Sequence, residues 1–293
     1  MTQQPALFIS HGAPTLAIEA SPAQSYLKEL GHHLERPRAI IVISAHHVCR
    51  GVAVTSDPQP ETIHDFAGFP SSLYEITYPA PGAPDLAADI VDLLAISGLE
   101  ARLQTRRGFD HGAWVPLSLV FPQADVPVVQ LSIDMSESPL GHYRLGQALA
   151  PLRNRNILIV GSGGATHNLG AFFHGDYEHD SPPPAWVSTF ADWIAARIAA
   201  GEVEAVLEAV ESGPFGSRNH PSMDHIHPLF VAMGAGAGSP AAARIHQSTT
   251  YGVLAMDVYG FGEPGQIERL ATTQEPAGHE RPVRDTAAFE APA

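Results

Sequence analysis

Short apolar runs rich in β-branched residues recur along the chain and predict strands that are buried on both faces. The clearest run is residues 39–43, reading AIIVI, and others occupy residues 6–10, 126–133 and 157–160. Segments with apolar residues on one face separate these runs and predict helices. Because strands and helices alternate, we expect an α/β fold in which helices flank a largely parallel or mixed central sheet.

The second half of the chain continues this pattern without a repeat or a linker. It predicts helices at 138–152, 185–199 and 202–211, a loop at 171–184, and two last strands at 242–247 and 253–258. A single domain over residues 1–262 is therefore expected. Residues 263–293 are polar, charged and proline-containing, which is typical of a loosely ordered tail.

Composition narrows the classes of function. The 293 residues carry a net charge of -15, which argues against nucleic acid or an anionic membrane as the main partner. No run of 18 apolar residues predicts a transmembrane helix, and the first residues lack a basic region, so a cytoplasmic protein is expected. Cys49 is the only cysteine and Lys28 the only lysine, which excludes a cysteine-based zinc site and disfavours Schiff-base chemistry. With 16 histidines, a metal site in this chain would be rich in nitrogen ligands.

Histidines recur where predicted strands stop, which is where open α/β sheets bind ligands. His11, His46, His111 and His167 each lie beside such an end, and residues 220–227 add three more histidines. Neighbouring side chains of a strand point to opposite faces, so His46 and His47 are not expected to share one role. The same holds for His225 and His227, two residues apart on a helix. Three or four imidazoles suit zinc, iron, copper or nickel better than magnesium or calcium.

Residues 57–84 form an unusually long connection that is rich in proline, glycine and aromatic residues. Connections of this length are often binding loops or lids. His64, Phe66, Phe69, Tyr74 and Tyr78 could wall a pocket for a planar ligand. A surface loop that packs only on itself is the alternative, and the sequence leaves both open.

Several short motifs together resemble the DODA-type (4,5-DOPA dioxygenase-like) extradiol aromatic ring-opening dioxygenases, which are related to the LigB-like class III enzymes. The motifs are SHGAP, SAHH, IHDF, GFP, YPAPG, FDHG, VQLSID, THNL and DHIHPL, in order over residues 5–261. The resemblance implies that His11, His46 and His225 are metal ligands and that residues 1–262 form the catalytic domain. It makes His167 a fourth ligand or an acid/base catalyst, and it places His111 in the pocket for substrate and oxygen.

This chain departs from the family pattern at two positions. His47 stands where the family usually has an aromatic residue, which could alter the pocket wall or add a stray ligand. LigB-like relatives use a carboxylate as the third iron ligand, and no Asp or Glu stands at the matching position here. The resemblance therefore implies a ligand set made only of histidines.

The function that the resemblance implies is the opening of a catechol ring, DOPA-like or otherwise substituted, with dioxygen. Fe(II) would be the working ion, and Zn(II) is expected in the isolated protein because it generally binds nitrogen ligands more tightly. His111 and His167 would move protons, and His64 and Phe66 would bind the catechol. A zinc-dependent hydrolase on the same histidines is the alternative, followed by a metal-binding protein without turnover. Arg50, Arg106 and Arg107 are candidates for holding a substrate carboxylate, and a homo-oligomer is compatible with the sequence.

Overall fold

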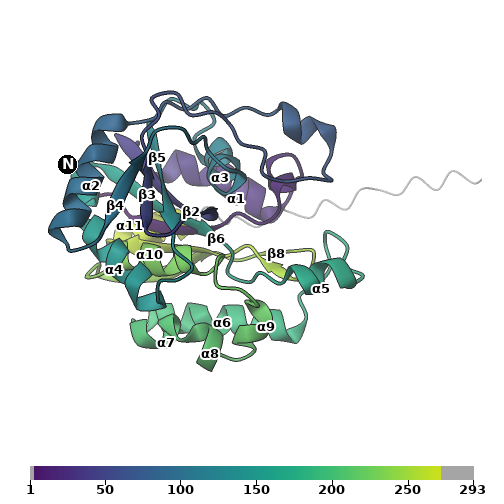
Figure 1. Ribbon diagram of the computed structural model, residues 1–293. Coiled ribbons are helices and arrows are strands. Elements are labelled where there is room, and N and C mark those ends of the chain that lie inside the picture. The colour runs from purple at the N-terminus through teal and green to yellow at the C-terminus, as the bar shows by residue number, and fades with distance from the viewer. Residues whose placement is uncertain (1–2, 272–293) are drawn as a thin grey trace, which may run out of the picture.

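The computed structural model describes residues 3–271, which form a mixed eight-stranded sheet between layers of helices (Figure 1). The strand order is β4-β3-β5-β2-β6-β1-β10-β7. The strands are β1 (Ala6–Ser10), β2 (Ala39–Val48), β3 (Val52–Thr55), β4 (Ala101–Gln104), β5 (Val128–Ile133), β6 (Ile157–Gly163), β7 (Ala241–His246) and β10 (Val258–Gly262). A small second sheet pairs β8 (Thr249–Thr250) with β9 (Leu254–Ala255).

The centre of the sheet is parallel and its borders are mixed. β6 pairs in parallel with β1 and with β2, and β2 pairs in parallel with β5. β10 is antiparallel to both β1 and β7, and β3 is antiparallel to β5. The prediction of one α/β domain with a largely parallel or mixed sheet is therefore confirmed.

Helices cover both faces of the sheet. On one face, α3 contacts β2 and β6, and α1 packs against α3. On the other face, α10 packs on β6 and β1, and α4 packs against α10 (Figure 1). The longer helices are α1 (Pro22–His33), α2 (Pro84–Ile96), α3 (His111–Val120), α4 (Pro139–Leu149), α6 (Ala185–Ala199), α10 (His227–Ala235) and α11 (Pro264–Ala271). The shorter ones are α5 (Leu169–His174), α7 (Val203–Leu207), α8 (Ala209–Ser212) and α9 (Gly216–Asn219), with 3-10 turns η1 (Pro14–Ala17), η2 (Ser71–Glu75) and η3 (Ala150–Arg155).

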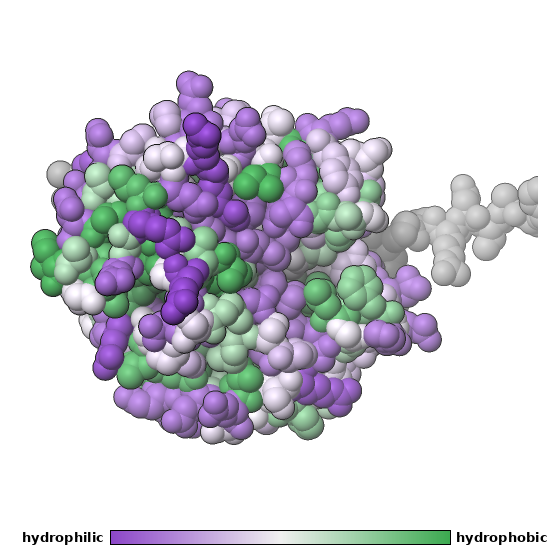
Figure 2. Space-filling view, viewed as in Figure 1, coloured by the Kyte–Doolittle hydropathy of each residue, from purple (hydrophilic) through white to green (hydrophobic). Residues whose placement is uncertain are grey.

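Polar and apolar residues are interspersed over most of the surface, and one region is richer in apolar residues. Figure 2 shows apolar residues gathered on the side of the molecule where α2 and β4 lie. Ile96 at the end of α2 is 86% exposed, and Leu103 of β4 is 45% exposed. β4 is also an end of the strand order, so this border of the sheet carries exposed apolar side chains.

Four sequence predictions about elements need correction. The strand expected at 253–258 is divided, because Leu254 and Ala255 pair with β8 across a left-handed turn at Tyr251 (φ 52°) and Gly252, and β10 begins only at Val258. The helix expected at 138–152 ends at Leu149 and tightens into η3, which begins beside Pro151. The helix expected at 202–211 is two short helices, and the loop expected at 171–184 begins inside α5.

The predicted tail also begins too early. Residues 264–271 form α11, which starts at Pro264 and buries Ile267 and Leu270 three positions apart on one face. Residues 272–293, the rest of the predicted tail, lie outside the described residues.

Candidate metal centre

Five histidines from five separate segments face one another at the carboxyl-terminal edge of the sheet. His11 follows β1, His46 lies near the end of β2, and His167 follows β6. His111 begins α3, and His225 comes two residues before α10. Each lies beside a predicted strand end or in the later histidine cluster, so the structure brings the histidines singled out in the sequence together.

Strand register explains why the first three segments meet. β6 lies between β1 and β2, with Ser10 opposite Gly163 and Ser44 opposite Ser162. These three parallel strands therefore end at one level, and the residues that follow them share one rim. Gly163 allows the approach of the fourth segment, because a Cβ there would lie 2.1 Å from the His225 carbonyl oxygen.

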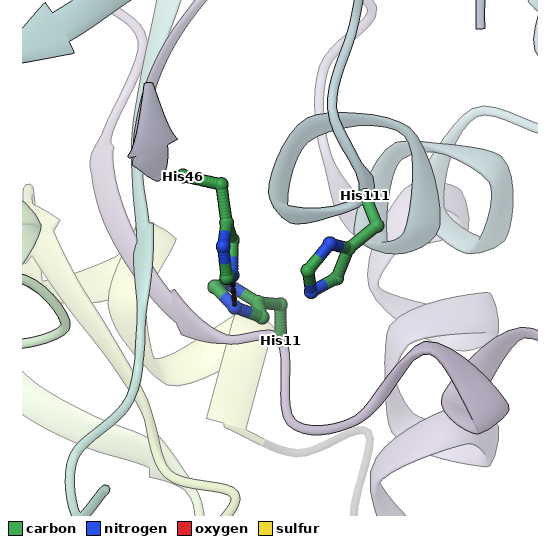
Figure 3. A group of neighbouring side chains, drawn as sticks. All are labelled: His11, His46 and His111. Carbon is green, nitrogen blue, oxygen red and sulfur yellow. Dashed lines mark hydrogen bonds between the residues drawn. The ribbon is translucent and has the colours of Figure 1, made fainter. Parts of the chain in front are cut away.

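The imidazole rings are close enough to act on a shared centre. Figure 3 shows the rings of His11, His46 and His111 turned toward one another, with the contact between His11 and His46 dashed. The ring centres are 5.0 Å apart for His11 and His46 and 3.9 Å apart for His46 and His111. The His225 ring centre is 4.9 Å from that of His46, and His167 stacks on His225 at 3.4 Å.

Two groups of these side chains have metal-binding spacing. The nitrogens of His11, His46 and His111 lie within 4.8 Å of one another. The same limit holds for ligand atoms of His167, Asp224 and His225. The choice of His225 as the third ligand beside His11 and His46 stays a prediction.

Oxygen partners orient the rings of His11 and His111. Ser162 Oγ donates to the Gly112 carbonyl, so it accepts from His11 Nδ1 at 2.9 Å. Asp65 Oδ1 accepts from the His111 backbone N–H at 2.9 Å and from its Nδ1 at 3.0 Å. Both histidines then present an unprotonated Nε2, which is the form that binds a metal.

A carboxylate stands in the same relation to His225, and another lies near His46 beyond hydrogen-bond distance. His225 Nδ1 donates to Asp224 Oδ2 at 2.5 Å, which leaves its Nε2 unprotonated. His46 Nδ1 lies 3.8 Å from Asp65 Oδ2. The sequence analysis missed both aspartates. Neither had a usable signal in the sequence, because Asp65 lies 46 residues from His111, and the position of Asp224 next to His225 does not by itself indicate a hydrogen bond.

The contact between His11 and His46 fits a metal ion. Their Nε2 atoms are 3.0 Å apart, and only one proton can lie between them. Two nitrogens bound to one ion at about 2.1 Å each would be separated by about 3 Å. An ion can therefore replace that proton, which His46 can hold on Nδ1 toward Asp65 instead.

The charges of the site also suit a dication. Burial, with a smaller effect of neighbouring histidines, lowers the pKa of His46 and of His167 to about 3 and that of His225 to about 4. Burial likewise lowers the pKa of His11 well below its usual value. Burial alone would raise the pKa of Asp65, but hydrogen bonds from His111 bring it to about 2. At neutral pH the site thus holds neutral imidazoles beside carboxylate ions.

The two histidines predicted to face away do so. His47 is buried, and its Nε2 lies 2.9 Å from Gln104 Oε1. It therefore adds no stray ligand to the cluster. His227 stacks on His142 with ring centres 3.9 Å apart.

The long connection reaches the cluster through part of its length. Phe66 packs edge-on against His111 at 5.7 Å and also contacts Phe69 and Tyr74. His64 is next to this group, with its Nε2 bonded to the Ile76 carbonyl at 3.0 Å. Tyr78 belongs instead to the core, because it is 2% exposed and donates to the Phe121 carbonyl. The loop therefore both packs on itself and borders the histidine cluster.

Of the arginines considered for a substrate carboxylate, Arg107 is already engaged. Its Nη2 donates to Asp110 Oδ2 at 2.9 Å and to the His46 carbonyl at 3.2 Å. It is therefore part of the framework behind His46.

His220 joins the segments that carry His167 and His225. Its Nε2 donates to the Ala165 carbonyl at 3.0 Å, while the His167 N–H donates to the Asn219 carbonyl. Full burial lowers the pKa of His220 to about 4. In the unfolded chain the value is about 6.5, so the unfolded state binds more protons as pH falls below that value.

The metal-free protein should accordingly lose stability on acidification. Between pH 7 and pH 5, His220 is expected to cost about 2 kcal/mol of unfolding free energy. His220→Gln keeps a donor for Ala165 but cannot titrate. Urea unfolding at pH 7 and pH 5 should therefore show that this variant loses about 2 kcal/mol less unfolding free energy than the parent protein. Equal losses in both proteins would contradict the assignment.

The chain is similar to known ring-opening enzymes over most of its length. The family model described as the catalytic LigB subunit of aromatic ring-opening dioxygenase matches residues 5–262. A 4,5-DOPA dioxygenase extradiol from Beta vulgaris is 40% identical, over 87% of this chain and 95% of that protein. One with the same name from Escherichia coli K12 is 39% identical, over 87% of this chain and 93% of that protein.

A solved structure supports the same relation. The crystal structure of the uncharacterized protein JW3007 from Escherichia coli K12 matches with a TM-score of 0.72 and 34% identity, over 88% of this chain and all of that one. Within residues 3–271, none of the helices has the length and apolar character needed to cross a membrane. The chain belongs to the LigB family of aromatic ring-opening dioxygenases and is an extradiol dioxygenase of that family.

Proposed function

We propose that this dioxygenase uses Fe(II) to open the ring of a catechol, DOPA-like or otherwise substituted, with dioxygen. The observation that carries the proposal is the cluster of imidazole rings at one edge of the sheet, in which oxygen atoms hold the Nδ1 of His11, His111 and His225 and leave their Nε2 for a metal or a proton. The similar proteins named as 4,5-DOPA dioxygenases suggest the substrate class.

His11, His46 and His225 would hold the iron, with His167 beside them. Fe(II), when bound, supplies a redox-capable centre with open positions for the catechol oxygens and dioxygen. The histidine set is neutral, so it leaves the full 2+ charge to lower the pKa of a catechol hydroxyl. Both atoms of dioxygen end in the product, a ring-opened semialdehyde acid.

His167 and His111 are suited to handle the protons. His167 is neutral at pH 7 and accepts a proton only when the catechol brings negative charge beside it, since its own pKa is low. His111 is fixed by Asp65 on Nδ1 and presents Nε2 as an acceptor. The proton taken from the hydroxyl can be returned as the ring opens.

A panel of catechols under air tests the function. Protein stripped of metal and loaded anaerobically with Fe(II) should consume one dioxygen per catechol and form a coloured ring-opened product. If the zinc form hydrolyses an ester or amide rapidly and the iron form consumes no catechol, the proposed function is wrong and the zinc-dependent hydrolase takes its place.

The metal that is present and the metal that works are expected to differ. Nitrogen ligands generally bind zinc more tightly than iron, so the isolated protein should contain mostly zinc. Zinc has no redox change and should give less than about one hundredth of the iron activity. Metal analysis together with oxygen uptake before and after exchange checks this prediction. An active zinc form would contradict it.

The long connection should set substrate affinity. Phe66 borders His111, so Phe66→Ala is expected to raise the catechol KM about tenfold by removing an aromatic contact worth about 1 kcal/mol or more. His64→Ala should act in the same direction through Phe66, which it contacts at 5.8 Å. Iron content should stay unchanged in both. Ile96→Ala on the exposed end of α2 is the control. Unchanged KM values would make the loop purely structural.

A further inference from the structure

A buried carboxylate lies behind the histidine cluster and contacts three separate elements. Asp110 has no exposed surface. Its Oδ1 accepts from Ser44 Oγ of β2 at 2.6 Å. Its Oδ2 accepts from Arg107 Nη2 at 2.9 Å and from Gln130 Nε2 of β5. The side chain is therefore held by a hydroxyl, a guanidinium and an amide, all of them donating.

Two of these donors also hold the backbone of His46. Ser44 Oγ accepts from the His46 N–H at 3.2 Å. Arg107 Nη2 donates to the His46 carbonyl at 3.2 Å. Both backbone polar groups of His46 are thus bonded to groups that Asp110 binds.

Asp110 is joined just as directly to His111. It is the N-cap residue of α3, and its carbonyl accepts from the N–H groups of Ala113 and Trp114 at 2.9 Å. The carboxylate that fixes the end of β2 therefore belongs to the residue that fixes the start of α3.

The two segments are packed without spare room. A Cβ on Gly112 would lie 2.4 Å from Ser44 Oγ and 3.0 Å from His46 Cδ2. Only glycine lets the first turn of α3 come this close to β2. The ring centres of His46 and His111 are 3.9 Å apart as a result.

We propose that Asp110 is a positioning residue, whose carboxylate holds His46 against His111 through Ser44 and Arg107 so that the metal centre has one fixed geometry. This inference rests on the proposed metal centre. The carboxylate of Asp110 contacts Ser44, Arg107 and Gln130 and none of the histidine rings. Its effect passes through the backbone of His46 and the first turn of α3.

The first test is metal affinity. Asp110→Asn keeps the shape of the side chain but loses its charge and one acceptor, so Arg107 loses its ion pair. Supporting groups of this kind alter metal affinity by about 10–100-fold, and at least tenfold weaker Co(II) binding is expected in chelator competition. Asp257→Asn is the matched control. Asp257 is 1% exposed, and its carboxylate binds Arg244 at 3.2 Å and Tyr259 at 2.9 Å, two side chains outside the histidine cluster.

The second test separates positioning from plain loss of stability. Both variants should unfold at lower temperature, but only Asp110→Asn should change the visible spectrum of the Co(II) protein. Arg107→Lys retains a cation beside Asp110 and should recover affinity and spectrum that Arg107→Gln loses. Asp110→Asn with an unchanged spectrum and affinity within twofold of the parent would overturn the proposal.

A measurement on the metal-free protein tests the role of Asp110 independently of the proposed function. Rings 3.9 Å apart should give nuclear Overhauser contacts between His46 and His111, and these should weaken in Asp110→Asn alone. If the parent binds no ion, the proposed function fails, and these contacts still decide the role of Asp110. If they persist unchanged in the variant, the positioning role is wrong whether or not the parent binds metal.

Discussion

His46→Ala is expected to weaken metal binding more than about 100-fold and to abolish ring opening, whereas His47→Ala should keep the metal. The two histidines are adjacent in β2 and point to opposite faces. The Nε2 of His46 lies 3.0 Å from that of His11, while His47 binds Gln104 on the other side. Metal content by mass spectrometry and affinity by chelator competition measure the difference. Metal loss in His47→Ala, with retention in His46→Ala, would contradict the assignment.

The same experiment distinguishes the third ligand. His225→Ala is expected to lose metal, because Asp224 holds its Nδ1 and leaves Nε2 directed into the cluster. His111→Ala should retain metal and lose turnover. His111 also has metal-binding spacing with His11 and His46. Loss of metal from His111→Ala, with retention in His225→Ala, would therefore make His111 the third ligand in place of His225. His227 stacks on His142 outside the cluster, so His227→Ala is the control for the loss of a buried histidine.

Periodicity was enough to predict the core of this fold. The run at residues 39–43 is the centre of β2, and it is buried because β5 and β6 flank it and helices cover both faces. The period of two in a strand also places His46 and His47 on opposite faces. Both inferences depend on patterns that repeat along the chain.

The features that were missed depend on single contacts. Asp65 sits in a long loop and orients His111 from 46 residues away, which no local period predicts. Asp224 sits beside the histidine that it orients, but neighbours in sequence give no evidence of a bond. The break between β9 and β10 arises because Leu254 and Ala255 pair with β8 in a separate sheet, whereas Val258 pairs with β1 and β7. Such positions are determined by tertiary packing.

The role of His167 is the second decisive prediction. Its ring stacks on His225 at 3.4 Å with an interplanar angle of 7°, and among residues 3–271 no hydrogen bond engages either ring nitrogen. Both ring nitrogens of His167 are therefore available, and we expect one of them to exchange a proton rather than to bind the metal, which the following variant tests. Neutrality at pH 7 leaves the ring ready to accept the proton of a bound catechol.

His167→Gln is therefore expected to retain Fe(II) while kcat falls about 100- to 10,000-fold, the usual cost of losing a positioned acid/base group. KM should change little, because Gln keeps a polar side chain of similar reach. His174→Gln in the neighbouring α5 is the matched control, since His174 is exposed and bonds only the Gly170 carbonyl. Iron content, kcat and KM are measured on the same preparations. Loss of iron from His167→Gln would make His167 a ligand, and full activity with iron bound would exclude it from both roles.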